Sequence, residues 1–382
     1  MPKLELIATT TFGLEAVVKR EIENLEYKIT KVDDGRITYM GDESAIVKSN
    51  LWLRCADRVL LKMGAFPVYS FEELYQQTRA LPWEEWIPMD GKFTVTGASV
   101  KSKLYSVPDC QSIVKKAIVD RLKDFYQCEW FAETGADFTT KVSILKDIAT
   151  ITIDTSGTGL HKRGYRIKDV AAPIKETLAS AMVQLSFWKS GRILVDPFCG
   201  SGTIPIEAAM LAKNIAPGLN RKFASEEWPA IPSDLWKAHR KEAYSAINYD
   251  LPLNIYASDI DPKAIEAAME NAIESRVDDC IEFKVMPASK LSLDDNHGII
   301  ISNPPYGERI GEKEKLISIY RDLRKLLEGN KTWSLYLLTS DERFEALFSE
   351  KPAHKRRKLY NGRIEVTYYQ YYGEKPKREE RL

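Results

Sequence analysis

The sequence predicts an α/β protein built in two parts, and three observations support this fold class. In the second half, short apolar strands alternate with amphipathic helices, which is typical of a doubly wound, mostly parallel sheet. In the first half, shorter strands and helices alternate, which predicts a smaller α+β module. Between them, Ser156-Gly157-Thr158-Gly159 marks a loop that is either a domain linker or an ordinary hairpin exit.

Hydrophobic periodicity defines the elements of the first half. The stretch 12–24 carries apolar residues at helical spacing, and Asp34-Gly35 is a turn signal inside the alternating stretch 28–39. Helices are expected over 12–24, 44–53, 70–81 and 108–125. Strands are expected over 3–10, 28–39, 59–66 and 92–98, with a hairpin of 141–145 and 150–154.

The second half has more regular units. Helices are expected over 173–188, 203–212, 262–275 and 316–327, and strands over 192–196, 254–259, 281–285, 298–302 and 334–338. Asn361-Gly362 favours a two-residue turn between 357–360 and 363–372, so the sheet is expected to end in an antiparallel hairpin. The stretch 214–252, rich in tryptophan and proline, is expected to be an insertion.

The composition is that of an ordinary globular protein, with 44% hydrophobic and 29% charged residues among 382. Basic and acidic residues balance at 55 each, so any nucleic-acid surface must be local. The cysteines and histidines are scattered without disulfide or metal-ligand spacing, so no metal is expected. There is no charged-then-apolar leader and no apolar run of about 18 residues. We therefore expect a cytoplasmic protein that makes no membrane contact.

The segment Val195–Thr203 is a glycine-rich turn between a strand and a helix. Ligands of such sheets bind at the carboxyl ends of the strands, and glycine lets the backbone approach them closely. A pyrophosphate would require a longer glycine fingerprint. Asp196 would repel a phosphate but can accept a hydrogen bond from the ammonium of a methionine-like ligand. The turn favours S-adenosylmethionine, with candidate contacts at Asp196, Phe198, Cys199, Gly200, Gly202 and Thr203.

A second acidic motif, Asp259-Ile260-Asp261, follows the next strand. A carboxylate there can accept hydrogen bonds from both ribose hydroxyls, which suits S-adenosylmethionine or NAD. Its distance from Asp196 far exceeds the usual separation of about 20 residues in a dinucleotide fingerprint. Asp261 fits the N-cap of the helix at Pro262, so Asp259 is the ribose candidate and Ile260 a neighbouring cofactor contact.

The third motif is Asn303-Pro304-Pro305-Tyr306, at the end of an apolar strand. An exocyclic base amine is a poor nucleophile because its lone pair is conjugated with the ring. Acceptors for its two N–H groups would direct that lone pair at a methyl donor. The Asn303 side-chain oxygen and the Pro304 carbonyl supply two acceptors, and Tyr306 offers a face for stacking the base. This motif predicts methyl transfer to a base amine, and Asn303 is also a candidate cofactor contact.

Two basic stretches are candidate RNA contacts, although charge runs are more often solvated faces. One is formed by Lys162, Arg163 and Arg166 near the junction of the halves, and the other contains Lys355 and Arg356.

Four longer segments of the sequence resemble one family. The three motifs are similar to those of class I methyltransferases that act on base amines. The segments 160–166, 196–203, 214–219 and 303–309 resemble the THUMP-domain RNA guanine-N2 methyltransferases of bacteria, closest to enzymes of large-subunit 23S ribosomal RNA. The resemblance covers essentially the whole chain.

This resemblance implies a ferredoxin-like segment over 1–64, a THUMP RNA-binding domain over 65–156 and a Rossmann-like methyltransferase domain over 165–374. It implies S-adenosylmethionine as cofactor and ribosomal RNA, or an assembly intermediate, as partner. Many class I methyltransferases place an acid after the third strand to contact the adenine amine. Here Pro287 and its neighbours stand at that place, so the contact is expected from backbone or from Ser289.

Three other functions fit part of the pattern. A DNA or RNA adenine-N6 methyltransferase also uses Asn-Pro-Pro-Tyr, but the first half resembles an RNA-binding module. A non-catalytic ribosome-assembly protein would not need the intact set of Asp196, Asp259 and Asn303. A nicotinamide dehydrogenase is least supported, because the glycine fingerprint and a catalytic histidine or Tyr-Lys pair are lacking.

Overall fold

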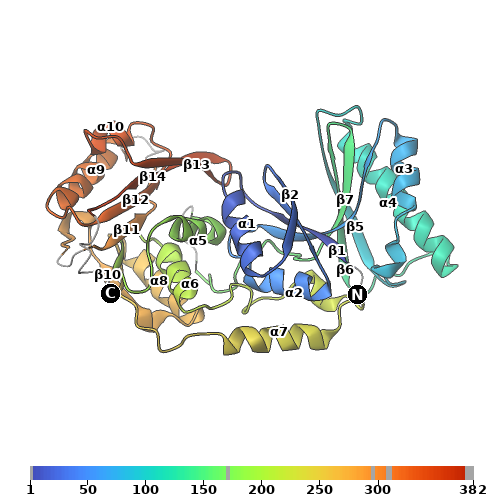
Figure 1. Cartoon of the computed structure of the whole chain (residues 1–382), viewed down its shortest axis with the longest axis horizontal. Coiled ribbons are helices and arrows are strands. Elements are labelled where there is room, and N and C mark those ends of the chain that lie inside the picture. The colour runs from blue at the N-terminus through green and yellow to red at the C-terminus, as the bar shows by residue number, and fades with distance from the viewer. Residues whose placement is uncertain (1–2, 169–172, 294–296, 307–311, 375–382) are drawn as a thin grey trace. The chain divides into compact units, whose positions relative to one another are not determined.

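The computed structural model describes residues 3–168, 173–293, 297–306 and 312–374 (Figure 1). The chain folds into two compact units. The first comprises 1–10, 18–160 and 221–242, and the second 11–17, 161–220 and 243–382. Within the described residues each unit is built on a seven-stranded sheet. The predicted α/β class is confirmed.

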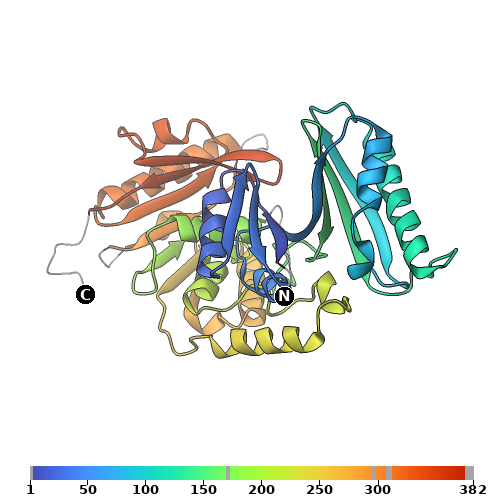
Figure 2. The same ribbon diagram turned by 45° about the vertical axis from the view of Figure 1, so that its right-hand side comes forward.

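The sheet of the first unit has the order β2-β3-β1-β4-β7-β6-β5, and its pairs are antiparallel except for β5 with β6. Helices α3 and α4 cover one face of the β5–β7 part, as Figure 2 shows. The strands are β1 (Leu4–Thr9), β2 (Lys28–Asp33), β3 (Arg36–Gly41), β4 (Arg58–Pro67), β5 (Lys92–Val100), β6 (Asp137–Leu145) and β7 (Ile148–Asp154). The helices are α1 (Glu15–Asn24), α2 (Glu43–Trp52), α3 (Phe71–Arg79) and α4 (Val107–Tyr126).

The sheet of the second unit has the order β10-β9-β8-β11-β12-β14-β13. Its first five strands are parallel, and β14 and β13 form the antiparallel hairpin expected at Asn361-Gly362. The strand order reverses between β8 and β11, which is where a doubly wound sheet binds its ligand. The strands are β8 (Leu194–Asp196), β9 (Ile255–Asp259), β10 (Ile281–Val285), β11 (Ile299–Ser302), β12 (Ser334–Thr339), β13 (Lys355–Asn361) and β14 (Ile364–Tyr371).

The helices of the second half agree with the prediction in part. The helices are α5 (Glu176–Leu185), α6 (Thr203–Ala212), α7 (Ser233–Ser245), α8 (Pro262–Glu274), α9 (Glu312–Glu328) and α10 (Phe344–Phe348). Helix α5 is shorter than expected, because Ser186 takes an extended conformation and its hydroxyl bonds to the Val183 carbonyl. Helix α7, which lies within the supposed insertion, and the short α10 were not predicted.

The segment 221–242 inside that insertion packs as part of the first unit. The Trp228 ring is buried and stacks on Phe138 at a centroid distance of 4.8 Å, and its indole N–H donates to the Asp137 carbonyl at 3.1 Å. The Ser225 backbone and hydroxyl both donate to the Thr155 carbonyl. The stretch that looked like an excursion from the second half therefore contributes to the core of the first unit.

The described residues contain neither a membrane-spanning helix nor a cluster of metal ligands. None of the helices there is long and apolar enough to span a membrane. No group of three or more histidine, cysteine, aspartate or glutamate side chains in those ranges could hold a metal ion.

Replacing Trp228 by alanine should destabilise the first unit by about 3–5 kcal/mol, because a buried indole is lost and Phe138 loses its stacking partner. Hydrogen exchange should accelerate in β6 while β12 of the second unit keeps its protection. The matched control is Trp130→Ala, since the Trp130 side chain is 74% exposed. Equal exchange in the two variants would contradict the anchoring role of Trp228.

Candidate active site

The three predicted motifs meet at the carboxyl ends of neighbouring parallel strands. Strand β8 pairs with β9 on one side and β11 on the other, so their ends lie side by side. The Gly200 N–H donates to the Asp259 carboxylate at 3.0 Å, and the Ser302 hydroxyl donates to Asp196. Hydrogen bonds thus connect the glycine turn with Asp259 and with Ser302, the residue before the third motif, at the switch point of the sheet.

The glycine turn requires its glycines. Gly200 and Gly202 have φ of +52° and +79°, in the left-handed region that side chains disfavour. A Cβ at Gly202 would lie 3.0 Å from the Cβ of Ala268. The turn closes with a bond from the Gly202 N–H to the Cys199 carbonyl, and α6 starts at the next residue. A side chain at Gly202 would therefore crowd Ala268 in addition to straining the backbone.

Asp196 is a buried acid with one oxygen unused. Its Oδ1 accepts from the Ser302 hydroxyl and from the Phe198 N–H at 3.2 Å. Its Oδ2 is buried without a hydrogen-bond partner in the part of the chain that the structure describes. Burial raises the pKa of Asp196 to about 7, against the hydrogen bonds that lower it, and the Asp259 carboxylate adds to the rise. A cationic ligand group would satisfy Oδ2 and stabilise the carboxylate.

The side chains of Phe198, Cys199 and Thr203 in this turn have separate structural roles. Burial raises the pKa of the Cys199 thiol well above its ordinary value, so this cysteine stays protonated and is a poor nucleophile. Phe198 is half-buried and packs against the core behind β11 and β12. Thr203 is buried, and its hydroxyl accepts a hydrogen bond from Arg166 at 2.8 Å.

The acidic motif after β9 behaves as predicted in one respect. The Asp261 side chain accepts from the Lys263 N–H at 2.9 Å and caps α8, so the capping interpretation is confirmed. Asp259 accepts from the N–H groups of Gly200 and Asp261, both at 3.0 Å. Ile260 is 70% exposed at the strand end, where it can contact a ligand.

In the third motif, the Tyr306 hydroxyl donates to the Asn303 side-chain oxygen at 2.7 Å. The Asn361 amide, from the end of β13, donates to the Tyr306 oxygen at 3.4 Å. The sequence predicts Asn361 only as a turn residue, and no local sequence pattern indicates its contact with Tyr306. Pro304 is buried and Pro305 exposed. Residues 307–309, which complete the segment 303–309, lie outside the described residues.

The predicted adenine contact, Ser289, is exposed on a short 3₁₀ helix over Ala288–Lys290. The Met286 N–H just before it donates to the Asp259 carbonyl at 2.9 Å, which attaches this segment to the end of β9. A hollow beside the segment is lined by several of its neighbours, among them Ser258, Met286 and Leu291. Ser289 is not one of the lining residues, and its role stays a prediction.

The RNA contact predicted for Arg163 is wrong, because its side chain is buried. The side chain of Arg166 is 15% exposed, and its contact with RNA stays a prediction. Arg163 is 2% exposed, and its guanidinium donates to Glu207 at 3.3 Å. Arg166 donates to Thr203 and to the Ile174 carbonyl, and it lies 3.4 Å from the Glu176 carboxylate. Arg163 is thus bonded to α6, and Arg166 is bonded to the first residue of α6 and lies beside the first residue of α5.

The other basic candidates are on the surface. Arg356 donates to both oxygens of Glu345, so its charge is largely compensated. Lys162 and Lys355 are exposed, and their contact with RNA stays a prediction. The signal that sequence analysis missed was Glu207, an acid in the otherwise apolar helix α6, where a buried charge requires a partner.

Replacing Arg163 by methionine should destabilise the second unit by about 3–5 kcal/mol, because Glu207 would keep a buried carboxylate without its cation. Urea unfolding followed by hydrogen exchange in α6 measures this loss. Lys162→Met is the matched control, since an exposed substitution should change stability by at most about 0.5 kcal/mol. A similarly small effect of both changes would mean that the pair is not needed.

Comparison with known proteins places the chain in a family. Residues 163–370 match the RMKL-like methyltransferase domain, 5–60 the RlmL ferredoxin-like domain and 68–154 the THUMP domain. This confirms the expected order of the three parts. The boundaries predicted at 64, 65, 156 and 165 stay predictions.

Full-length relatives agree. The Bacillus subtilis (strain 168) protein "Putative RNA methyltransferase YpsC" is 50% identical over 99% of both chains. A Listeria monocytogenes str. 4b F2365 structure, described as a predicted N6-adenine-specific DNA methylase, is 49% identical over 98% of this chain and 97% of that one, with a TM-score of 0.94. A methyltransferase structure complexed with SAH, SMU.472, is 43% identical over 99% and 100%, with a TM-score of 0.93.

The fold extends to more distant proteins. TrmN from Thermus thermophilus shares 21% identity over 97% of this chain and 100% of its own, with a TM-score of 0.70, and shows the same fold. The match over 163–370 covers more than half of the sequence. The chain therefore belongs to the RMKL-like methyltransferases and carries the ferredoxin-like and THUMP domains in front of the methyltransferase domain.

Proposed function

We propose that this protein transfers a methyl group from S-adenosylmethionine to the exocyclic N2 amine of a guanosine in 23S ribosomal RNA. The observation that supports the chemistry is the oriented Asn303 carboxamide at the end of β11, beside the glycine turn of β8. The family and the THUMP match support RNA as the acceptor. The choice of guanine, of N2 and of the large subunit is based on the sequence resemblance.

Four features of the site suit S-adenosylmethionine. The buried Oδ2 of Asp196 lacks a partner within the described ranges and suits the ammonium of the methionine part. The glycine turn would let the ligand approach the backbone, and Asp259, which lies beside this turn, would accept from the ribose hydroxyls. Ile260 would cover the adenine. The SMU.472 relative, which was crystallised with SAH, supports the same ligand. When bound, the cofactor supplies a methyl group on a sulfonium.

The residues of this chain act on the acceptor amine. The Asn303 oxygen has two lone pairs, and Tyr306 uses one of them. The other can accept an N–H of the base amine, with the Pro304 carbonyl as the second acceptor. These contacts direct the nitrogen lone pair at the methyl group, so orientation and electrostatics provide the rate rather than a strong base. Tyr306, held by Asn361, fixes the direction of the Asn303 carboxamide.

A second candidate is methylation of adenine N6 in DNA, because the Listeria relative is described in those terms. Asn-Pro-Pro-Tyr chemistry serves both amines. Tritium incorporation from labelled S-adenosylmethionine into purified ribosomal RNA or into duplex DNA separates the two. We expect label in RNA, and label confined to DNA would overturn the proposal.

Asn303→Ala should lower the rate of methyl transfer by at least about a hundredfold while S-adenosylmethionine still binds, because the main loss is the acceptor for the amine. Tyr306→Phe should cost less, since the stacking face remains and only the orienting bond is removed. Single-turnover rates and calorimetry measure the two effects. Undiminished turnover by Asn303→Ala would contradict the mechanism.

Binding of S-adenosylmethionine should weaken by up to about tenfold per pH unit as pH falls from about 7 to about 5.5. The ligand ammonium prefers ionised Asp196, whereas burial keeps this group protonated below its pKa of about 7. In the ligand-free protein, folding stability depends on pH in the opposite direction. Burial raises the pKa of Asp196, so its contribution to stability is greatest at low pH and is lost as pH rises through about 7. Calorimetry in buffers of different ionisation enthalpy would detect the released proton.

Asp196→Asn is the matched variant for this test. It keeps the shape and removes the titration, so affinity should become nearly independent of pH over that range and weaker at pH above about 7. The same pH dependence in Asp196→Asn would show that another group is responsible.

A further inference from the structure

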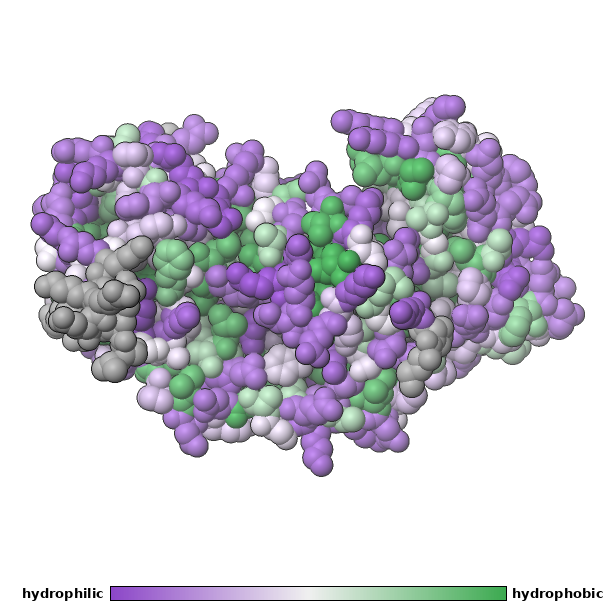
Figure 3. Space-filling model, viewed as in Figure 1, coloured by the Kyte–Doolittle hydropathy of each residue, from purple (hydrophilic) through white to green (hydrophobic). Residues whose placement is uncertain are grey.

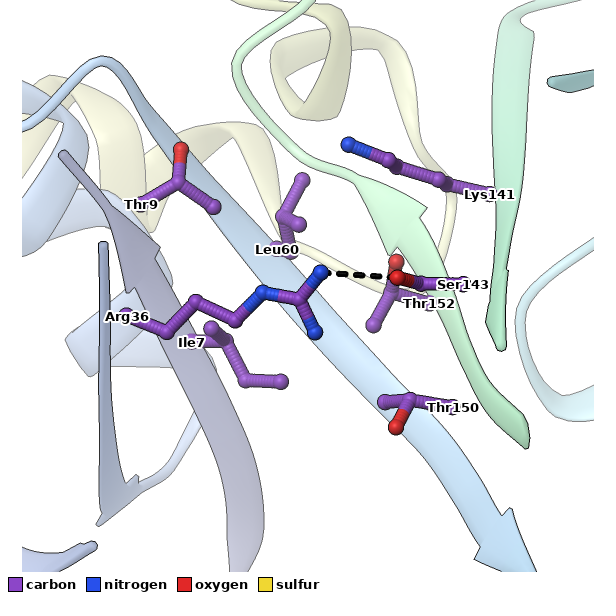
Figure 4. A pocket seen from close by; sticks show the side chains of 8 residues that line it. All are labelled: Ile7, Thr9, Arg36, Leu60, Lys141, Ser143, Thr150 and Thr152. Carbon is purple, nitrogen blue, oxygen red and sulfur yellow. Dashed lines mark hydrogen bonds between the residues drawn. The ribbon is translucent and has the colours of Figure 1, made fainter. Parts of the chain in front are cut away.

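The hollow on the first sheet is closed by the protein's own side chains. It is lined by residues of β1, β3, β4, β6 and β7, and its volume of about 10 Å³ has room for no more than one water molecule. Figure 4 shows Arg36 extending across it, and the Arg36 guanidinium donates to the Ser143 hydroxyl at 2.7 Å. A larger ligand therefore has no room there.

An exposed aromatic ring lies against the last hairpin of the second unit. Phe12 falls within the segment 5–60 that matches the RlmL ferredoxin-like domain, but it packs in the second unit. Phe12 is 56% exposed, and its ring meets that of Tyr360 edge to face at a centroid distance of 6.4 Å. Tyr360 is itself held, because its hydroxyl donates to Glu365 at 3.3 Å and Lys358 lies over its ring. The Phe12 ring is thus attached to the hairpin and more than half open to solvent.

The backbone next to Phe12 packs tightly on β13. Gly13 has a φ of +90°, and a Cβ at this position would lie 2.7 Å from a backbone oxygen of β13 and 3.0 Å from a methyl carbon of Leu359. Leu359 and Asn361 are two residues apart on this strand, so their side chains share one face of it. The Asn361 amide contacts the Tyr306 hydroxyl. Phe12 therefore approaches the hairpin on the face that also carries the contact with the acceptor site.

The charge at the tip of this hairpin favours an anion. Arg363, in the turn between β13 and β14, is exposed and makes no ion pair with any residue that the structure describes. The acid two residues further on, Glu365, is paired with Lys358 at 2.6 Å. Figure 3 shows mainly hydrophilic side chains over β13. An exposed aromatic ring and a cation on one hairpin are the groups that hold the bases and phosphates of a single-stranded nucleic acid.

We propose that Phe12 stacks on the RNA base next to the methylated nucleotide, with Arg363 as a contact for the phosphates of that strand. A base that reaches Asn303 must leave its own stack, so its neighbour loses a stacking partner. A fixed phenyl ring near the acceptor site replaces that partner, and it accepts any base because it has no hydrogen-bonding groups. The inference rests on the proposed function, since it takes RNA as the acceptor. It adds a side chain of the ferredoxin-like segment to the substrate site of the methyltransferase domain.

The test compares Phe12→Leu, which keeps an apolar side chain but removes the ring, with Phe187→Leu. Phe187 is 60% exposed and also pairs with a tyrosine, Tyr336, but it lies between α5 and β8, at the amino ends of the parallel strands. Single-turnover methyl transfer by the full-length protein is measured over a range of 23S RNA concentrations. Phe12→Leu should raise the half-saturating RNA concentration at least about fivefold, the lower limit for the loss of one stacked base.

The maximal rate and the affinity for S-adenosylmethionine should stay unchanged in Phe12→Leu, because the stacking ring touches neither the reacting amine nor the cofactor. Phe12→Tyr should restore the half-saturating concentration, since its ring stacks equally well. Phe187→Leu should behave as the unmodified protein. A loss confined to the maximal rate would mean that Phe12 acts through the hairpin and Asn361 rather than on RNA, and it would overturn the inference.

The remaining outcomes separate the two proposals. An unchanged half-saturating concentration in Phe12→Leu, with guanosine of 23S RNA still methylated, would overturn this inference alone. Methylation of adenine, with the expected rise in Phe12→Leu, would overturn the guanine proposal alone. If no ribosomal RNA is methylated, anisotropy of a fluorescein-labelled RNA single strand decides, and equal affinities of Phe12→Leu and Phe187→Leu would overturn the stacking contact.

Discussion

The structure depends on the hydrogen bonds that fix the glycine turn at the carboxyl end of β8. Asp259 accepts from the Gly200 N–H across the strand pair, and Asp196 accepts from Ser302 on the other side. Because β8 lies between β9 and β11, a single turn is tied to both of its neighbours. The same bonds leave one Asp196 oxygen with no partner among the described residues, so the turn that organises the sheet also creates the demand for a cationic ligand.

Two arginines bond to α6, the helix that follows the glycine turn. Arg163 pairs with Glu207, and Arg166 bonds to Thr203 at the start of α6. Buried ion pairs contribute little net stability, since desolvation offsets much of their attraction, but removing one partner is costly. This arrangement makes the position of α6 sensitive to any single loss. We interpret these bonds as fixing the position of α6 next to the proposed ligand site rather than as a source of net stability.

Local patterns predicted most strands and helices, because burial of one face imposes a period that survives in the sequence. They also located Asp196, Asp259 and Asn303, because the carboxyl ends of parallel strands share one edge. What they could not show were contacts between distant segments. Arg163 looked like a surface cation because sequence does not display burial, and the bonds of Tyr306 to Asn361 and of Arg36 to Ser143 depend on sheet curvature and topology.

In the proposed reaction, Asn303 directs a guanine N2 amine of 23S ribosomal RNA at the methyl donor. Mass-spectrometric mapping of ribosomal RNA from cells lacking the protein tests it most directly, with complementation by the unmodified gene and by the Asn303→Ala variant. We expect one N2-methylguanosine of 23S RNA to disappear and to return only with the unmodified gene. An unchanged set of N2-methylguanosines, or loss of N6-methyladenosine instead, would contradict it.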